Sequence, residues 1–103
     1  MLRHTMNTKT ITVNVTQEDI DAGHSASCVA CPIALAIRRL PYDITFLVEV
    51  THIYAFPKNH PPGDVGVRIQ LPREAMKFIN EFDHDLPCAP FTFEVQLPIQ
   101  LIA

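Results

Sequence analysis

Phe91-Thr-Phe-Glu-Val-Gln-Leu97 is the stretch that decides the fold, because it is the clearest strand in the sequence. Apolar and polar residues alternate strictly along it, which is the pattern of a strand with one buried face. Residues 10–15 show the same alternation, with isoleucine and valine against threonine and asparagine. We therefore expect two half-buried strands, one in the first fifth of the chain and one in the last fifth.

A short helix is expected directly after the first of these strands. The Thr16 side chain can accept a hydrogen bond from the backbone of Asp19, three residues on, and acidic side chains are favoured at the positive end of a helix. Gly23 suits the left-handed conformation in which many helices end. The sequence therefore predicts a helical turn over residues 17–22.

Two longer helices are indicated by apolar residues at helical spacing. The first is expected over residues 28–40, with Pro32 in its first turn, where proline is tolerated. Arg38 and Arg39 then fall in its last turn, where their charge complements the helix dipole. The second helix is expected over residues 72–82.

The remaining apolar segments predict a hairpin. Residues 44–56 are typical of one long strand, and residues 65–71 of the strand that returns beside it after a proline-rich turn over residues 57–64. The order is then strand, helix, strand, strand, helix, strand. This is an α+β, ferredoxin-like arrangement, in which two helices cover one face of an antiparallel sheet.

Length and composition limit the class of protein. The chain has 103 residues, of which 48% are hydrophobic and 18% charged, which suits one folded domain. We expect a flexible N-terminal segment over residues 1–9, a single α+β domain over residues 10–103, and an apolar tail over residues 99–103 suited to an edge or an interface. The net charge of −3 argues against binding of duplex nucleic acid. No apolar run is long enough for a membrane span, and a signal peptide is not indicated, so a cytoplasmic protein is expected.

Catalytic motifs are missing from the sequence. It contains no G-x-S-x-G, no H-E-x-x-H and no G-x-G-x-x-G, and three glycines in the whole chain argue against a phosphate-binding loop. We therefore expect a protein that is not an enzyme.

The cysteines carry one motif, a C-x-x-C formed by Cys28 and Cys31. Three cysteines without an export signal indicate free thiols, and a thiol at a helix N-terminus has a lowered pKa. Three interpretations stay open. The first is a zinc site built from His24, Cys28, Cys31 and Cys88, the second is thiol redox chemistry, and the third is a purely structural role as small buried side chains.

Four of the basic residues are candidates for anion binding. They are Arg38, Arg39, Arg68 and Arg73. Arginine binds phosphate through a two-pronged fork, and in an oligomer several copies of these residues could converge on one anion. The alternative is that they pair with helix dipoles and keep the surface soluble.

Two motifs make the chain similar to known phage proteins. TQEDIDAG over residues 16–23 leads into CVACPIALA over residues 28–36, and related segments follow over residues 71–83 and 90–94. Together they resemble a family of short, mostly uncharacterised proteins encoded by bacteriophages, prophages and bacteria. The resemblance carries no catalytic residues. It implies a small accessory phage gene, whose products often neutralise a host factor and include oligomers that sequester nucleotide immune signals.

These observations lead to one hypothesis with two alternatives. We expect a non-enzymatic counter-defence protein that binds a small anionic, nucleotide-derived host signal as a homo-oligomer. The four arginines would supply charge, and Tyr54 or Phe56 would stack on a base. One alternative is an inhibitor that binds a host defence protein through the acidic helix end around Glu81, Asp83 and Asp85. The other is a small zinc protein that uses the C-x-x-C.

Overall fold

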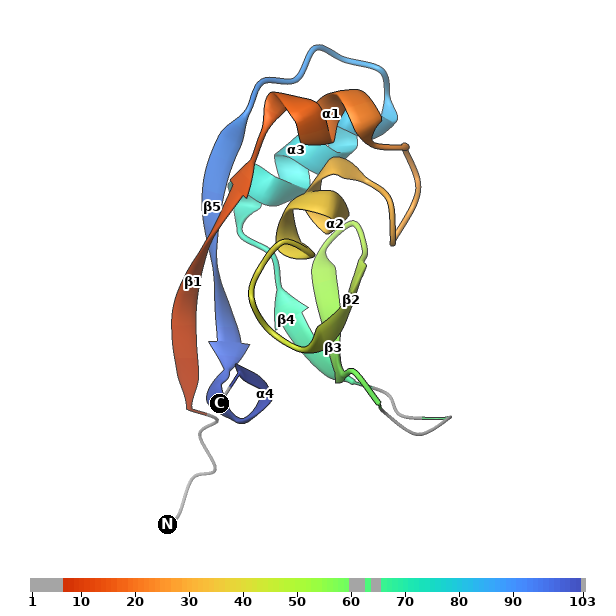
Figure 1. Ribbon diagram of the computed structural model, residues 1–103. Coiled ribbons are helices and arrows are strands. Elements are labelled where there is room, and N and C mark those ends of the chain that lie inside the picture. Colours follow the sequence, from red (N-terminus) through yellow and green to blue (C-terminus); the bar gives the residue numbers. More distant parts are fainter. Residues whose placement is uncertain (1–6, 60–62, 64–65, 103) are drawn as a thin grey trace.

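A computed structural model describes residues 7–59, 63 and 66–102 of the chain (Figure 1). Its strands are β1 (Thr8–Val15), β2 (Ile44–Val48), β3 (His52–Pro57), β4 (Val67–Gln70) and β5 (Phe91–Pro98). Its helices are α1 (Gln17–Ala22), α2 (Pro32–Ile37), α3 (Arg73–Asp83) and α4 (Ile99–Ile102). The fold class is α+β with antiparallel sheets, as predicted.

β1 and β5 form a two-stranded antiparallel sheet. Val13 lies opposite Phe93, and Ile11 lies opposite Val95, so the alternating apolar residues of both strands share one buried face. This confirms the two strands predicted near the ends of the chain. β1 begins at Thr8, which shortens the expected N-terminal segment, and residues 1–6 of that segment lie outside the described residues.

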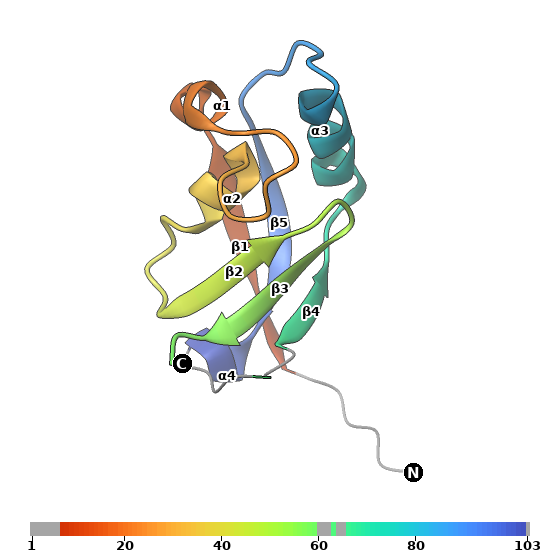
Figure 2. The same ribbon diagram turned by 90° about the vertical axis from the view of Figure 1, so that its right-hand side faces the viewer.

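β2, β3 and β4 form a second antiparallel sheet, with β3 in its centre. Figures 1 and 2 show this sheet lying against the β1–β5 pair, with α1, α2 and α3 gathered toward one end of the molecule. The core lies between the layers. Its largest fully buried side chains include Ile33, Ile37, Ile53, Leu71 and Leu97.

The predicted long strand over residues 44–56 is wrong, because the chain turns back on itself between β2 and β3. The Glu49 backbone N–H donates to the His52 carbonyl at 2.7 Å, and the Leu71 N–H fixes the turn by donating to the Thr51 carbonyl at 3.0 Å. The turn contains no glycine, proline, asparagine or aspartate, the residues that usually mark one. Its consequence is that the described residues form five strands in two sheets, which does not confirm the single ferredoxin-like sheet with two helices on one face.

α1 follows the prediction closely at its start. Thr16 and Asp19 form a capping box, with the Thr16 hydroxyl accepting from the Asp19 N–H at 3.2 Å and the Asp19 carboxylate accepting from the Thr16 N–H at 2.9 Å. Gly23 is not left-handed, however, since its φ is −74°. Glycine is needed there for another reason, because a Cβ would lie 2.6 Å from Cδ of Pro32.

α2 is much shorter than the helix predicted over residues 28–40. It begins at Pro32, with Cys31 as its N-cap, and ends at Ile37. The Ser27 hydroxyl accepts from the Ala30 N–H at 3.0 Å, so a separate turn occupies the C-x-x-C segment. Arg38 and Arg39 therefore follow the helix, where the prediction had them in its last turn.

The chain ends described by the structure are packed on the core. Leu101 and Ile102 of α4 are partly buried against it, and the Ile99 N–H donates to the Asn7 carbonyl at 2.9 Å. The apolar tail thus forms a short helix on its own chain over residues 99–102, and residue 103 lies outside the described residues. No helix in the described part of the chain is long and apolar enough to span a membrane.

Candidate functional site

Arg39 is bound to the protein itself. Its guanidinium holds the Asp19 carboxylate through two hydrogen bonds, of which the one from Nη2 to Oδ2 measures 2.9 Å. Nη2 also donates to the Asn14 carbonyl at 2.9 Å. We call Asn14, Thr16, Asp19 and Arg39 the Asp19 cluster. It ties the end of α2 to β1 and to the first turn of α1, so Arg39 has a structural role.

The Asp19 cluster keeps its carboxylate charged. Asp19 is only 4% exposed, and burial acts to raise its pKa. The hydrogen bonds from Arg39 and Thr16 act in the opposite direction and outweigh burial, so the pKa of Asp19 lies below its ordinary value. The ion pair therefore persists at neutral pH.

The other three candidate arginines are exposed and separate from one another in the fold. Arg38 is the C-cap of α2, Arg73 is the first residue of α3, and Arg68 lies in the middle of β4. Within the described residues none of the three is part of an ion pair. Of these three arginines, only Arg68 lies on the same face of a sheet as a candidate aromatic residue, Tyr54.

The outer face of the three-stranded sheet gathers two of the predicted aromatic and basic residues. Its register places Tyr54 directly opposite Arg68 and Leu47, and directly paired residues of antiparallel strands share a face. No helix crosses this face in Figure 2. We call it the open sheet face, and it consists of Thr45, Leu47, His52, Tyr54, Phe56, Arg68 and Gln70.

His52 joins Arg68 at one end of the open sheet face. Its Nδ1 lies 2.6 Å from the Thr51 hydroxyl and 3.4 Å from Nη2 of Arg68. Because a guanidinium only donates, this geometry suits a His52 tautomer that carries its proton on Nε2. Among the described residues, the Arg68 guanidinium therefore has the His52 ring and no carboxylate as a side-chain partner.

Phe56 is more buried than the rest of the open sheet face, at 8% exposure. Gly66, with a φ of +71°, lies over its ring so closely that a Cβ there would be 2.7 Å from Cε2. Phe56 therefore supports the face from within, while the Tyr54 side chain is only half-buried.

The four residues predicted to hold zinc divide between two hollows. Cys28 and Cys31 line one, and His24 and Cys88 line another beside Phe82 and Leu86. Across residues 7–59, 63 and 66–102, no three histidine, cysteine or acidic side chains are close enough together to hold a metal ion. The described structure therefore provides no geometry for the predicted zinc site.

The thiols also differ from the expectation of a lowered pKa. Burial raises the pKa of Cys31, and the backbone N–H groups of Ala34 and Ile33 lower it by less. Burial likewise raises the pKa of Cys88. A raised pKa leaves less reactive thiolate at neutral pH, which favours a structural role for Cys31. All three cysteines are free thiols.

The acidic helix end is partly engaged within the chain. Glu81 accepts from Nζ of Lys77 at 2.9 Å, and Asp83 accepts from the Ala26 N–H at 3.0 Å. Asp85 is exposed in the turn after α3, with a φ of +57°. Two of the three carboxylates proposed for binding a partner protein therefore also stabilise the fold.

His52 and Leu47 lie beside Tyr54 on the open sheet face, and neither was predicted as its neighbour. One continuous strand over residues 44–56 would place Val50, His52 and Tyr54 on the face of Val48, whereas the turn places His52 and Tyr54 outside and leaves Val50 58% exposed. Val50 and Thr51, which precede His52, are not typical turn residues, so the local sequence gave no signal that the chain changes face here.

The comparisons with known proteins leave the site to be interpreted from its geometry. No protein-family model, no curated protein and no solved structure matches the chain.

Proposed function

We propose that the open sheet face binds a small anionic ligand derived from a nucleotide. One observation carries the proposal: Arg68 lies directly opposite Tyr54 on a face that no described helix covers, and it has no acidic partner among the described residues. An exposed arginine beside an aromatic ring matches the two parts of a nucleotide, its phosphate and its base.

Each side chain would contact a different part of the ligand. The Tyr54 ring would stack on the base, because aromatic rings contribute on the order of 1–3 kcal/mol per stacked base. The Arg68 guanidinium would bind phosphate oxygens through its two-pronged fork. The Nε2–H of His52 would add a further hydrogen-bond donor beside Arg68.

The open sheet face covers only one side of such a ligand. A second copy of the chain, packed face to face, would enclose the base between two Tyr54 rings and bring two Arg68 side chains to one anion. Such packing would agree with the expected homo-oligomer. It would also cover Leu47, which is half-buried on the same face. A ligand enclosed between copies would leave slowly, as a sequestering protein requires.

The biological role follows from the resemblance to phage-encoded accessory proteins. A protein that binds a nucleotide signal without converting it would act by removing that signal from a host defence system. We therefore propose a non-enzymatic counter-defence protein that works in the host cytoplasm. Zinc is not needed for this role.

Native mass spectrometry of the gently purified protein, before and after denaturation, tests the proposal. An oligomer that releases a nucleotide-sized molecule on denaturation is the expected result, and the released mass names the ligand class. A monomer that carries no small molecule and binds none of AMP, cyclic di-AMP or ATP would contradict it. Capture of a host protein by that monomer would favour the protein-binding alternative instead.

A further inference from the structure

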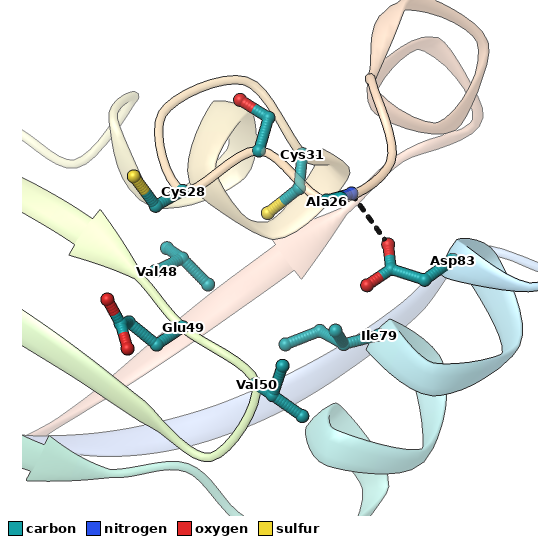
Figure 3. Close-up of a pocket in the computed structure, with 9 residues that line it drawn as sticks. Ala26, Cys28, Cys31, Val48, Glu49, Val50, Ile79 and Asp83 are labelled. Carbon is teal, nitrogen blue, oxygen red and sulfur yellow. Dashed lines mark hydrogen bonds between the residues drawn. The ribbon is translucent and has the colours of Figure 1, made fainter.

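The hollow lined by Cys28 and Cys31 lies away from the open sheet face, between the C-x-x-C segment, the β2–β3 turn and α3 (Figure 3). Its volume is about 390 Å³, which is within the range of small-molecule sites. The backbone holds its walls together, because the Val48 N–H donates to the Cys28 carbonyl at 2.8 Å and the Ala26 N–H donates to Asp83. It is therefore a built feature of the fold.

The inner wall of this hollow is apolar. Cys31, Val48 and Ile79 line it and are each less than a tenth exposed. Val50 lies at its rim with 58% of its surface exposed. An apolar group entering the hollow would cover Val50 and gain contacts with all four side chains.

The charge at this hollow is negative. Glu49 and Asp83 flank it from different elements, as Figure 3 shows, and no lysine, arginine or histidine is among the described residues that line it. Asp83 uses Oδ1 for the Ala26 N–H, and this leaves Oδ2 for another donor. Within the described chain the Glu49 carboxylate has neither an ion pair nor a hydrogen bond.

We propose that this hollow binds a small organic cation, an ammonium group carried on a compact apolar body. The apolar body would lie against Val48, Val50 and Ile79, and the ammonium group would bind Oδ2 of Asp83. The Glu49 carboxylate lies at the opposite rim of the hollow and points away from Asp83, so it would add a longer-range attraction (Figure 3). This is a different ligand from the anion proposed for the open sheet face, and the two sites share no residue. A nucleotide phosphate would be repelled here.

A hydrated metal ion fits the hollow less well than an organic cation. No three acidic, histidine or cysteine side chains of the described residues come close enough to coordinate one, and the apolar wall offers no oxygen ligands. An alkylammonium ion uses both features of the hollow, because its chain is apolar and its charged end needs only one carboxylate in contact.

Titration with n-hexylammonium, followed by two-dimensional amide NMR, tests this assignment. The neutral isostere n-hexanol is titrated in parallel, so that the charge is the only difference between the two probes. We expect the shifts to map to Val50, Ile79 and the C-x-x-C segment. We expect the ammonium to bind about fivefold more tightly than the alcohol, with a dissociation constant on the order of 1–10 mM.

Two conservative variants locate the charge selectivity. Asp83→Asn is expected to weaken hexylammonium binding about threefold and Glu49→Gln by less than about twofold, and both should leave hexanol binding unchanged. Asparagine at position 83 keeps an oxygen for the Ala26 N–H, so the loop stays anchored. Glu74→Gln removes the same charge from the exposed first turn of α3 and should have no effect on either probe.

Alkylation of Cys28 gives an independent readout. Cys28 is exposed at the edge of the hollow, so a bound hexylammonium ion is expected to slow its reaction with iodoacetamide, while Cys88 in the other hollow reacts at an unchanged rate. The proposal is overturned if the two probes bind equally, if the preference for ammonium survives in the Glu49→Gln/Asp83→Asn double variant, or if the shifts map elsewhere. Because the test uses no nucleotide, its failure leaves the open sheet face untouched.

Discussion

The Asp19 cluster and the open sheet face each contain an arginine expected to bind a ligand, and the two side chains are in opposite situations. Arg39 is half-exposed, but its fork is occupied by a buried carboxylate and a backbone carbonyl. Arg68 is exposed, lies opposite Tyr54, and within the described chain has the His52 ring but no carboxylate as a side-chain partner. The difference teaches that an arginine is free for a ligand only where the fold supplies no counter-charge.

The contrast also changes which substitutions are informative about binding. Replacing Arg39 would leave Asp19 charged and nearly buried without its partner, so any loss of binding in such a variant could come from unfolding. Replacing Arg68 removes charge from a surface whose packing does not depend on it. Experiments on ligand binding therefore belong on β3 and β4.

Breaking the Asp19 cluster is the change with the largest expected effect. Asp19→Ala removes the capping box of α1 and leaves Arg39 without its carboxylate, and we expect the free energy of unfolding to fall by about 2–3 kcal/mol. Urea denaturation measures this loss. Asp21→Ala, on the exposed side of the same helix, is the matched control and should change stability by less than about 0.5 kcal/mol. Equal effects of the two substitutions would contradict the structural role of the cluster.

The Asp19 cluster should also produce a pH dependence of stability. Because the pKa of Asp19 is lowered in the folded state, the folded protein binds fewer protons than the unfolded chain in the acidic range. Its contribution is complete above the ordinary aspartate pKa and is lost as the pH falls through the lowered value. Denaturation curves measured between pH 6 and about pH 2 should show this decline, and Asp19→Asn should lack that part of it.

Next to Phe56 of the open sheet face, the substitution Gly66→Ala is expected to have an intermediate effect on stability. The alanine would have to adopt a left-handed backbone conformation, and its Cβ would collide with the Phe56 ring. We therefore expect a loss of about 1–2 kcal/mol in stability. Gly63→Ala is the control, since its φ is also positive, at +89°, but no atom of the other described residues lies within 4 Å of its Cβ position. A larger loss at Gly63 than at Gly66 would show that the contact with Phe56 is unimportant.

The smallest effect is expected beside the C-x-x-C segment, where the backbone of Ala26 is left-handed with a φ of +55°. Ala26→Gly relieves that strain and keeps the N–H that donates to Asp83, so it should raise stability by about 0.5–1 kcal/mol. Ala22→Gly, at the end of α1, should not stabilise the protein. Thermal denaturation of the pair distinguishes the two cases.

Elements with local signals were predictable from the sequence. The alternation in residues 91–97 identified β5, and the Thr16–Asp19 spacing identified the cap of α1, because both patterns act over a few neighbouring residues. The turn at residues 49–51 was missed because it contains no typical turn-forming residues. A hydrogen bond from Leu71, about twenty residues later, stabilises it instead. That miss concealed the second sheet.

The candidate site was predictable only in part, for the same reason. Tyr54 and Arg68 were both named from their chemistry, but their pairing depends on the β3–β4 register, and the position of His52 depends on the missed turn. Arg39 was also predicted to bind the ligand, because nothing in the sequence near it reveals its partner, the buried Asp19, twenty residues earlier. Ion pairs across the fold are settled by tertiary packing.

Equilibrium binding of cyclic di-AMP and AMP to Arg68→Ala and Arg38→Ala is the most direct test of the central claim. Both variants remove one exposed arginine that has no ion pair among the described residues, so they match in net charge. The account predicts that Arg68→Ala weakens binding of the favoured nucleotide about tenfold, as expected for a lost charge-assisted contact, while Arg38→Ala binds like the unaltered protein. Equal affinity of the two variants for that nucleotide would contradict it.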